Sequence, residues 1–169
     1  MEVGRSFSPP EPLQNSHDIS GFDCGEPTLN SWLMTRAADN MESLASRTYV
    51  VLKKDSAQVC GYYSLSMGHL LHVQVSSKHR RNMPEQIPCA LIGRLAVDLK
   101  FKGAGIGSSL LQDAVFRARL ATEYVAARFV MLHSLNDNAT RFYAWHGFLP
   151  LREGSQTLGL DLKSFKPQE

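Results

Sequence analysis

The 169-residue sequence lacks several features that would assign it to a specialised class of protein. No apolar run approaches the roughly 20 residues that a helix needs to span a bilayer, and the first residues lack the apolar segment of a secretory signal. The three cysteines, Cys24, Cys60 and Cys89, are odd in number and widely spaced, which argues against a disulfide framework or a zinc cluster. The six histidines have no metal-ligand spacing. We therefore expect a single domain over residues 1–169 in the reducing cytoplasm, with no metal and no membrane contact.

What the chain does contain is an uneven distribution of charge. The formal net charge is only +2, but residues 78–128 hold nine basic and four acidic side chains, a local charge of +5. The rest of the chain therefore carries −3. Such a basic window favours a polyanionic ligand, although a solvated helix face produces similar charge, and both interpretations stay open on charge alone.

Hydrophobic periodicity predicts an α/β fold. Strand-like patterns cover residues 48–52, 59–67, 70–75, 89–97, 129–135 and 158–162. Helical spacing predicts one helix capped by Thr28 and continuing to Ala37, a second over residues 106–118, and a third capped by Asn136 or Asp137 and ended by Gly147. We expect residues 1–15 to be extended, Gly68 to form a tight connection between two strands, and residues 78–88, with two prolines, to form a loop. Strands predominate early and alternate with helices later, an order typical of a mixed sheet.

The most informative segment is a glycine-rich turn between a predicted strand and a predicted helix, residues 102–107 (KGAGIG). Glycine allows a positive φ and lets a ligand approach the backbone without a Cβ in the way. The first N–H groups of the following helix have no internal partner and lie at the positive end of its dipole. The turn therefore favours phosphate binding, and a turn that only packs tightly is the alternative.

Two nucleotide-binding classes do not fit this turn. A P-loop requires Gly-Lys-Ser/Thr, whereas Gly107 is followed directly by Ser108. A dinucleotide-binding turn requires an acidic residue at the end of the next strand, which here ends in His133, Ser134 and Leu135. The turn also lies beyond residue 100 rather than at the start of a βαβ array.

In its context the turn resembles the GCN5-related N-acetyltransferase (GNAT) family. Residues 102–107 match the family's pyrophosphate loop, Arg/Gln-x-x-Gly-x-Gly/Ala, with lysine at the first position. Residues 94–98 (RLAVD) resemble the central strand that binds the pantetheine arm, and residues 136–148 resemble the later N-x-x-A-x-x-F-Y-x-x-x-G-F segment. The resemblance implies a GNAT fold, a mixed central β-sheet flanked by helices in which a splayed pair of parallel strands holds acetyl-CoA. The acetyl-CoA contacts that it implies are Leu95, Ala96, Val97, Lys102, Gly103, Ala104, Gly105, Ile106, Gly107, Ser108, Asn136, Asn138 and Phe142.

Motifs elsewhere in the chain resemble one subgroup, the acetyltransferase toxins of type II toxin–antitoxin systems. They lie at residues 22–25 (FDCG), 29–33 (LNSWL), 47–51 (RTYVV), 61–65 (GYYSL) and 133–135 (HSL). The resemblance implies acetyl transfer from acetyl-CoA to the free α-amine of an aminoacyl-tRNA, which blocks translation. It also implies a homodimer and a ribbon-helix-helix antitoxin that neutralises the enzyme. Operator DNA is expected to be bound only by the complex with the antitoxin, which represses its own operon.

Tyr143 is the predicted catalytic residue, because the resemblance places it facing the sulfur of the thioester. A phenol there donates its proton toward the departing thiolate, whereas the alternative role is packing beside Phe142 and Trp145. An α-amine has a pKa of about 8, so a strong protein base is not obligatory. Water, a backbone carbonyl and His133 are the candidate proton acceptors. A backbone N–H within residues 95–97 is expected to meet the carbonyl oxygen.

Basic side chains supply the candidate contacts to tRNA phosphates: Arg36, Lys78, Arg80, Arg81 and Arg94. Two alternative functions stay open at this point. One is an acetyltransferase that acts on a small-molecule amine or a protein N-terminus, although a polyamine favours acidic walls that the basic window does not offer. The other is a non-catalytic regulator that binds acetyl-CoA.

Overall fold

The computed structural model describes residues 6–165, which form two compact units. The first unit contains the chain up to Ser66 together with Gly93–Ala114, and the second contains Met67–Ile92 and the chain from Val115 onward. Residues 1–5 of the predicted extended segment lie outside the described residues.

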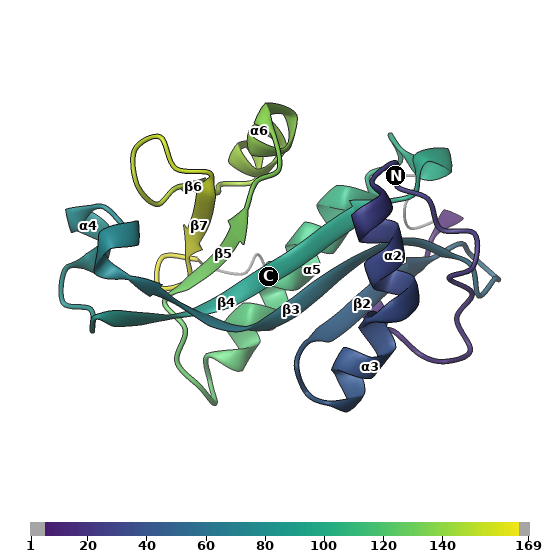
Figure 1. Ribbon diagram of the computed structural model, residues 1–169, viewed down its shortest axis with the longest axis horizontal. Helices are drawn as coiled ribbons and strands as arrows, with labels where there is room; N and C mark the ends of the chain where they lie inside the picture. Colours follow the sequence, from purple (N-terminus) through teal and green to yellow (C-terminus); the bar gives the residue numbers. More distant parts are fainter. Residues whose placement is uncertain (1–5, 166–169) are drawn as a thin grey trace. The chain divides into compact units, whose positions relative to one another are not determined.

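The first unit contains the N-terminal strands and helices and the beginning of the longest helix. Its elements are β1 (Glu11–Pro12), α2 (Pro27–Thr35), α3 (Ala37–Glu42), β2 (Arg47–Leu52), the first part of β3 (Val59–Leu71), the end of β4 (Gln86–Val97), the 3-10 helix η2 (Leu99–Phe101) and the first part of α5 (Ile106–Ala121). β1 and β3 both pair with β2 in antiparallel fashion. In this unit α3 packs beside β2 (Figure 1).

The second unit contains the remaining elements: the 3-10 helix η1 (His72–Gln74), α4 (Ser77–Arg80), β5 (Phe129–His133), α6 (Asp137–Trp145), β6 (Leu149–Pro150) and β7 (Thr157–Asp161). β5 runs parallel to β4, whereas β7 is antiparallel to both β5 and β6. The strand order of the sheet is β1-β2-β3-β4-β5-β7-β6. The predicted mixed sheet is therefore confirmed.

Each unit has its own hydrophobic cluster. In the first unit, Trp32 and Leu33 of α2 pack with Val50 of β2, Tyr62 of β3 and Ala96 of β4. In the second, a cluster includes Leu70, Ile87, Cys89, Phe129, Met131 and Leu151. Among the described residues, no helix has the length and apolar character needed to cross a membrane.

The predicted break at Gly68 is wrong, because β3 continues through this glycine to Leu71. The φ of Gly68 is not positive, and a Cβ added there would meet only the Cβ of Leu91, at 3.6 Å. The residue therefore behaves as an ordinary strand residue. Beyond it, the predicted strand over residues 70–75 ends early, and His72–Gln74 form η1.

Two further boundaries differ from the predictions. The predicted loop over residues 78–88 contains α4 and the first residues of β4, including Pro88, whose carbonyl oxygen accepts a hydrogen bond from Arg128 N at 2.8 Å. Thr28 does not cap α2: the N-cap is the extended residue Glu26, and Pro27 occupies the first turn, where its fixed φ suits the start of a helix. The predicted helix also divides at Arg36, so that Ala37 begins α3.

Candidate functional site

The predicted site residues are distributed over both units, and each unit is described by itself. The first unit contains Arg36, Arg94, Leu95, Ala96, Val97 and residues 102–108. The second contains Lys78, Arg80, Arg81, Asn136, Asn138, Phe142 and Tyr143.

The glycine-rich turn uses the conformational freedom that glycine allows. Gly103 and Gly105 have φ values of +82° and +84°, in the left-handed region that favours glycine. A Cβ at Gly103 would meet nothing within 4 Å, so the turn is open on that side. The 16-residue helix α5 begins directly afterwards at Ile106. The N–H groups in the first turn of a helix favour anions, and Lys102, which precedes this helix, is exposed.

A buried carboxylate fixes the chain that leads into the turn. Asp98 is 1% exposed, and its two oxygens accept hydrogen bonds from Lys100 N at 2.8 Å and Asp23 N at 3.1 Å. A backbone hydrogen bond from Leu99 N to Asp23 O, at 2.9 Å, adds to this connection. The FDCG segment therefore positions the entry to the glycine turn, a role that its sequence alone does not reveal.

The start of α5 lies unusually close to the sheet of the first unit because β3 has a glycine at position 61. A Cβ on Gly61 would lie 2.8 Å from Ile106 Cγ2, 3.0 Å from Leu110 Cδ1 and 3.2 Å from the backbone oxygen of Ala96. No side chain fits at these distances without displacement of a neighbour. The absent side chain thus sets how near the first turn of α5 lies to β3 and β4.

Two of the predicted acetyl-CoA contacts have side chains that belong to the core. Ile106 is 1% exposed and Ala96 is 5% exposed. Only their backbone groups are therefore available to a ligand. Leu95 and Val97 are half-buried, as are Gly107 and Ser108.

Arg94 does not extend freely into solvent but lies on an aromatic stack. Its guanidinium carbon is 4.3 Å from the centroid of the Trp32 ring, which stacks on Tyr62 with a centroid distance of 5.9 Å and an interplanar angle of 9°. The hydroxyl of Tyr62 donates to Leu29 O at 2.7 Å. Burial raises the pKa of Tyr62 far above its ordinary value, so this hydroxyl stays a donor. The sequence pattern placed Trp32 in a helix but did not pair it with Arg94.

In the second unit, Asn136 rather than Asp137 is the N-cap of α6, so one of the two candidate caps is confirmed. Asn136 Oδ1 accepts a hydrogen bond from Ala139 N at 2.9 Å, as an N-cap side chain does. This oxygen is therefore already engaged, while Asn138 is exposed and accepts from Arg141 Nη2. Gly147 follows the helix with a φ of +90°, as predicted for its C-terminal end.

Tyr143 lies on α6 between aromatic neighbours. Its ring packs against Phe142 and Phe148, with centroid distances of 5.3 and 6.1 Å. Burial raises the pKa of Tyr143 to about 12, so the phenol keeps its proton at any physiological pH. Within the described part of the chain its hydroxyl has no hydrogen-bond partner. The arrangement is that of a protonated donor without an internal acceptor.

The predicted basic residues of the second unit are exposed. Lys78 and Arg80 belong to α4, and Arg81 follows it. His133, a candidate base, is also exposed, and its Nδ1 lies 2.9 Å from Thr157 Oγ1. That hydrogen bond engages Nδ1, so Nε2 is the nitrogen of the ring that it does not occupy.

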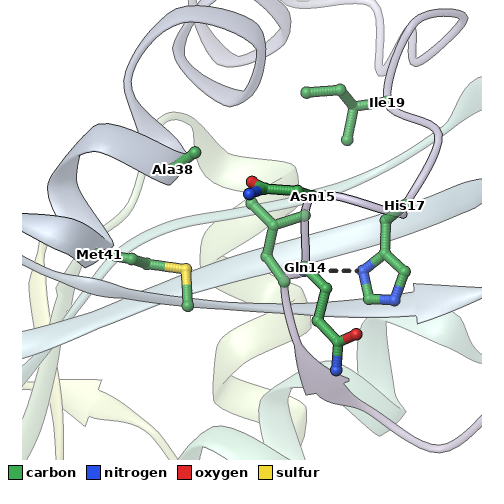
Figure 2. A pocket seen from close by; sticks show the side chains of 7 residues that line it. Gln14, Asn15, His17, Ile19, Ala38 and Met41 are labelled. Carbon is green, nitrogen blue, oxygen red and sulfur yellow. Dashed lines mark hydrogen bonds between the residues drawn. The ribbon is translucent and has the colours of Figure 1, made fainter.

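A pocket of about 280 Å³ in the first unit contains none of the predicted site residues. Figure 2 shows it between the N-terminal segment and α3, lined by Leu13, Gln14, Asn15, His17, Ile19, Ala38 and Met41. The imidazole of His17 accepts a hydrogen bond from the Gln14 backbone N at 3.0 Å (Figure 2). Its lining carries no lysine, arginine, aspartate or glutamate.

The family model described as acetyltransferase (GNAT) domain matches residues 45–150, and the chain belongs to this family. It is therefore an acetyl-CoA-dependent N-acetyltransferase, and the sequence-based assignment of fold and reaction class is confirmed. A curated relative from Mycobacterium tuberculosis, named tRNA-acetylating toxin, is 37% identical over 142 residues, which is 84% of either chain.

Solved structures of two toxins are also similar. A tyrosine-to-phenylalanine variant of KacT is 28% identical with a TM-score of 0.87, covering 94% of this chain and 96% of that one. AtaT in complex with acetyl-methionyl-tRNAfMet is 29% identical with a TM-score of 0.84 and the same coverage. Other AtaT structures contain the C-terminus of the antitoxin AtaR (TM-score 0.79), acetyl-CoA with that antitoxin (0.78) or DNA with the AtaT–AtaR complex (0.72).

Proposed function

We propose that this enzyme is the toxin of a type II toxin–antitoxin system and that it acetylates the free α-amine of an aminoacyl-tRNA. The observation that carries the proposal is the 37% identity to a tRNA-acetylating toxin over 84% of the chain. The acetylated aminoacyl-tRNA has no free amine with which to form a peptide bond, so translation stops.

The direct test is incubation of the purified protein with acetyl-CoA and total charged tRNA, followed by nuclease digestion and mass spectrometry of the aminoacyl adenosines. We expect at least one N-acetylated aminoacyl adenosine, which also identifies the amino acid. If the same preparation acetylates a peptide N-terminus or a small amine and leaves charged tRNA unmodified, the proposal is wrong and the alternative substrate class replaces it.

The chemistry needs little from a protein base. An α-amine with a pKa of about 8 is partly neutral at cellular pH, and esterification of the adjacent carboxyl lowers its pKa further. The amine nitrogen forms a bond to the acetyl carbon, the carbon–sulfur bond breaks, and the amine proton passes to water. The remaining requirement is stabilisation of the thiolate of CoA.

We assign that stabilisation to Tyr143. Complete proton transfer from a phenol of pKa about 12 to a thiolate whose ordinary pKa is about 8.5 costs roughly 5 kcal/mol, at about 1.4 kcal/mol per pKa unit. Tyr143 therefore acts by donating a hydrogen bond as negative charge develops on sulfur, and solvent completes the protonation. Such assistance contributes about 10²- to 10⁴-fold to the rate.

The variant Tyr143→Phe tests this assignment. We expect kcat to fall by about 10²- to 10⁴-fold while the affinity for acetyl-CoA is retained, because only the hydroxyl is removed. Tyr124→Phe is the matched control, since Tyr124 is 88% exposed. The assignment fails if Tyr143→Phe turns over at a rate close to that of the control.

Binding of acetyl-CoA rests on residues 95–97 through their backbone, on residues 102–108, and on Asn136, Asn138 and Phe142. Recognition of tRNA rests on four exposed basic residues and on Arg94; the four are Arg36, Lys78, Arg80 and Arg81. Arg80→Glu combined with Arg81→Glu is expected to weaken acetylation of charged tRNA and to retain affinity for acetyl-CoA. Unchanged activity on charged tRNA would remove α4 from the acceptor site.

The proposal also covers regulation. The enzyme forms a homodimer in the cytoplasm, a ribbon-helix-helix antitoxin neutralises it, and the complex of the two proteins binds operator DNA. The support is the resemblance of the chain to AtaT, whose structures include an antitoxin and DNA. Light scattering of the purified enzyme tests the dimer. Co-expression with the small protein encoded next to its gene tests neutralisation, and growth arrest despite that protein would contradict it.

A further inference from the structure

The second unit contains an open hollow of about 530 Å³, and Arg80 is the one residue of its lining to which the proposed function gives a role. It is formed by residues that follow β3, by the start of α4 and by the segment after β6. Its lining residues are Val73, Val75, Ser76, Ser77, Arg80, Arg152 and Glu153.

Two arginines of this hollow are held by neighbouring carbonyl groups. Arg80 Nη1 donates to His72 O at 3.3 Å, and Arg152 Nη1 donates to Val73 O. Both acceptors belong to η1, although the arginines are 72 residues apart in the sequence. Each guanidinium keeps several other N–H donors for a ligand. Because the carbonyls already restrict both side chains, less conformational entropy is lost when an anion binds.

A serine in the wall of the hollow lacks a hydrogen-bond partner. Ser76 occupies the N-cap position of α4, but its side chain makes no capping hydrogen bond, and its Oγ is buried and unpartnered among the described residues. The Ser76 backbone N donates to Leu151 O at 2.7 Å, which joins α4 to the segment that carries Arg152. Ser76 is therefore a residue of the lining whose hydroxyl has no partner within the described part of the chain.

The remaining charged group, Glu153, does not neutralise the arginines. Within the described residues it forms no ion pair with either Arg80 or Arg152, and it is exposed. The lining thus carries two positive charges and one negative charge. It contains no aromatic side chain on which a base could stack, so the lining favours a backbone phosphate over a nucleobase.

We propose that this hollow binds a phosphodiester of the RNA backbone and that Arg152, together with Arg80, forms its anion-binding pair. The inference rests on the proposed function, because it assumes that RNA is the acceptor substrate. It adds a phosphate site separate from the glycine turn and a residue, Arg152, that the sequence patterns did not select. Contact with a backbone phosphate fixes the position of the RNA without reading its sequence.

The test is the salt dependence of binding of deacylated tRNA, measured by fluorescence anisotropy for the full-length protein and the variants Arg80→Gln, Arg152→Gln and their combination. Each phosphate contact contributes about 0.7 to 0.9 to the slope of log K against log salt concentration. Because both arginines meet one phosphate, we expect the double variant to lose about one unit of slope rather than two. Arg152→Lys, which keeps the charge but not the planar fork, is expected to retain most of the slope.

Lys54→Gln is the matched control, since Lys54 is exposed and lies in the first unit. Thermal unfolding of every variant confirms that the fold is intact, and inorganic phosphate is used as a competitor to distinguish RNA from a free anion. The inference is overturned if the double variant keeps the wild-type slope, if Lys54→Gln loses as much, or if millimolar phosphate displaces the arginines' contribution completely. Acetylation of charged tRNA by the wild-type enzyme is measured in parallel. A hollow that does not bind phosphate is thereby distinguished from an enzyme that does not act on charged tRNA.

Discussion

Gly61 is the position where the smallest chemical change is expected to have a measurable effect on both stability and substrate binding. In Gly61→Ala the new Cβ lies 2.8 Å from Ile106 Cγ2, whereas ordinary contacts begin at 3.4 Å, so the start of α5 must retreat by about 0.6 Å. Ile106 has little freedom to yield, because it is β-branched and 1% exposed. The oxygen of Ala96, at 3.2 Å, limits movement on the side of β4.

The magnitude follows from two opposing contributions. Overpacking of this kind costs about 1–3 kcal/mol, and the reduced freedom of the unfolded chain returns about 0.4–1 kcal/mol. The net destabilisation of Gly61→Ala is about 1–2 kcal/mol, which for a domain of this size lowers Tm by about 2–8 °C. Because Ile106 directly follows the glycine turn, we also expect the KM for acetyl-CoA to rise by up to roughly tenfold, equivalent to about 1.4 kcal/mol of binding free energy.

Differential scanning calorimetry and initial-rate kinetics measure both effects, and Gly68→Ala is the control on the same strand. A Cβ at Gly68 meets Leu91 Cβ at an ordinary 3.6 Å, so this variant is expected to be as stable as the wild type or slightly more stable. Equal Tm values for Gly61→Ala and Gly68→Ala would refute the packing argument. A lower Tm with an unchanged KM would separate the close approach of α5 from the position of the glycine turn.

Three further predictions concern a helix cap, an ion pair and the thiols. Asn136→Ala removes the N-cap of α6 and is expected to lower the free energy of unfolding by about 1 kcal/mol in chemical denaturation, whereas Asn136→Ser should restore most of it. Burial opposes ionisation of Asp161, but hydrogen bonds from Arg128 and a backbone N–H outweigh it and hold the pKa of this carboxyl below its ordinary value. The contribution of Asp161 to stability is therefore present at neutral pH and is lost as the pH falls below about 4. In Asp161→Asn the fall of Tm at acid pH should be less steep than in the wild type, and an equally steep fall would contradict this. Cys60 and Cys89 are 0% exposed, and burial raises the pKa of each to about 11, so a disulfide reagent such as DTNB at pH 8 should label neither in the folded protein and both in denaturant.

The sequence was most informative where local chemistry determines the structure. The repeat of apolar residues from Ile106 predicted α5, and Asn136 was one of two candidate caps, the one whose side chain accepts a hydrogen bond from a backbone donor three residues away. The glycines of residues 102–107 were noted because glycine allows a positive φ, and Gly103 and Gly105 both have one. Each of these features depends on residues that lie close together in the sequence.

Predictions failed where the tertiary environment decides between conformations that a residue allows equally. Glycine suits both a turn and a strand, and β3 continues through Gly68 because nothing obstructs the extended chain there. Pro88 was expected to lie in a loop, but it belongs to β4, where its carbonyl oxygen accepts a hydrogen bond from Arg128 N. Arg94 stacks on Trp32, and Arg80 and Arg152 line the same hollow. In both pairs the residues are more than 60 positions apart in the sequence, and no periodicity in the chain connects them.

The stack of Arg94 on Trp32 also gives the enzyme an intrinsic optical probe. The chain contains two tryptophans, of which Trp145 is 87% exposed and Trp32 is 8% exposed. Iodide in solution quenches the emission of Trp145 selectively, so the remaining fluorescence comes from an indole whose ring lies 4.3 Å from a guanidinium carbon. Any acceptor that draws Arg94 away from this ring changes the environment of Trp32, and stopped-flow fluorescence can follow that event in unlabelled protein.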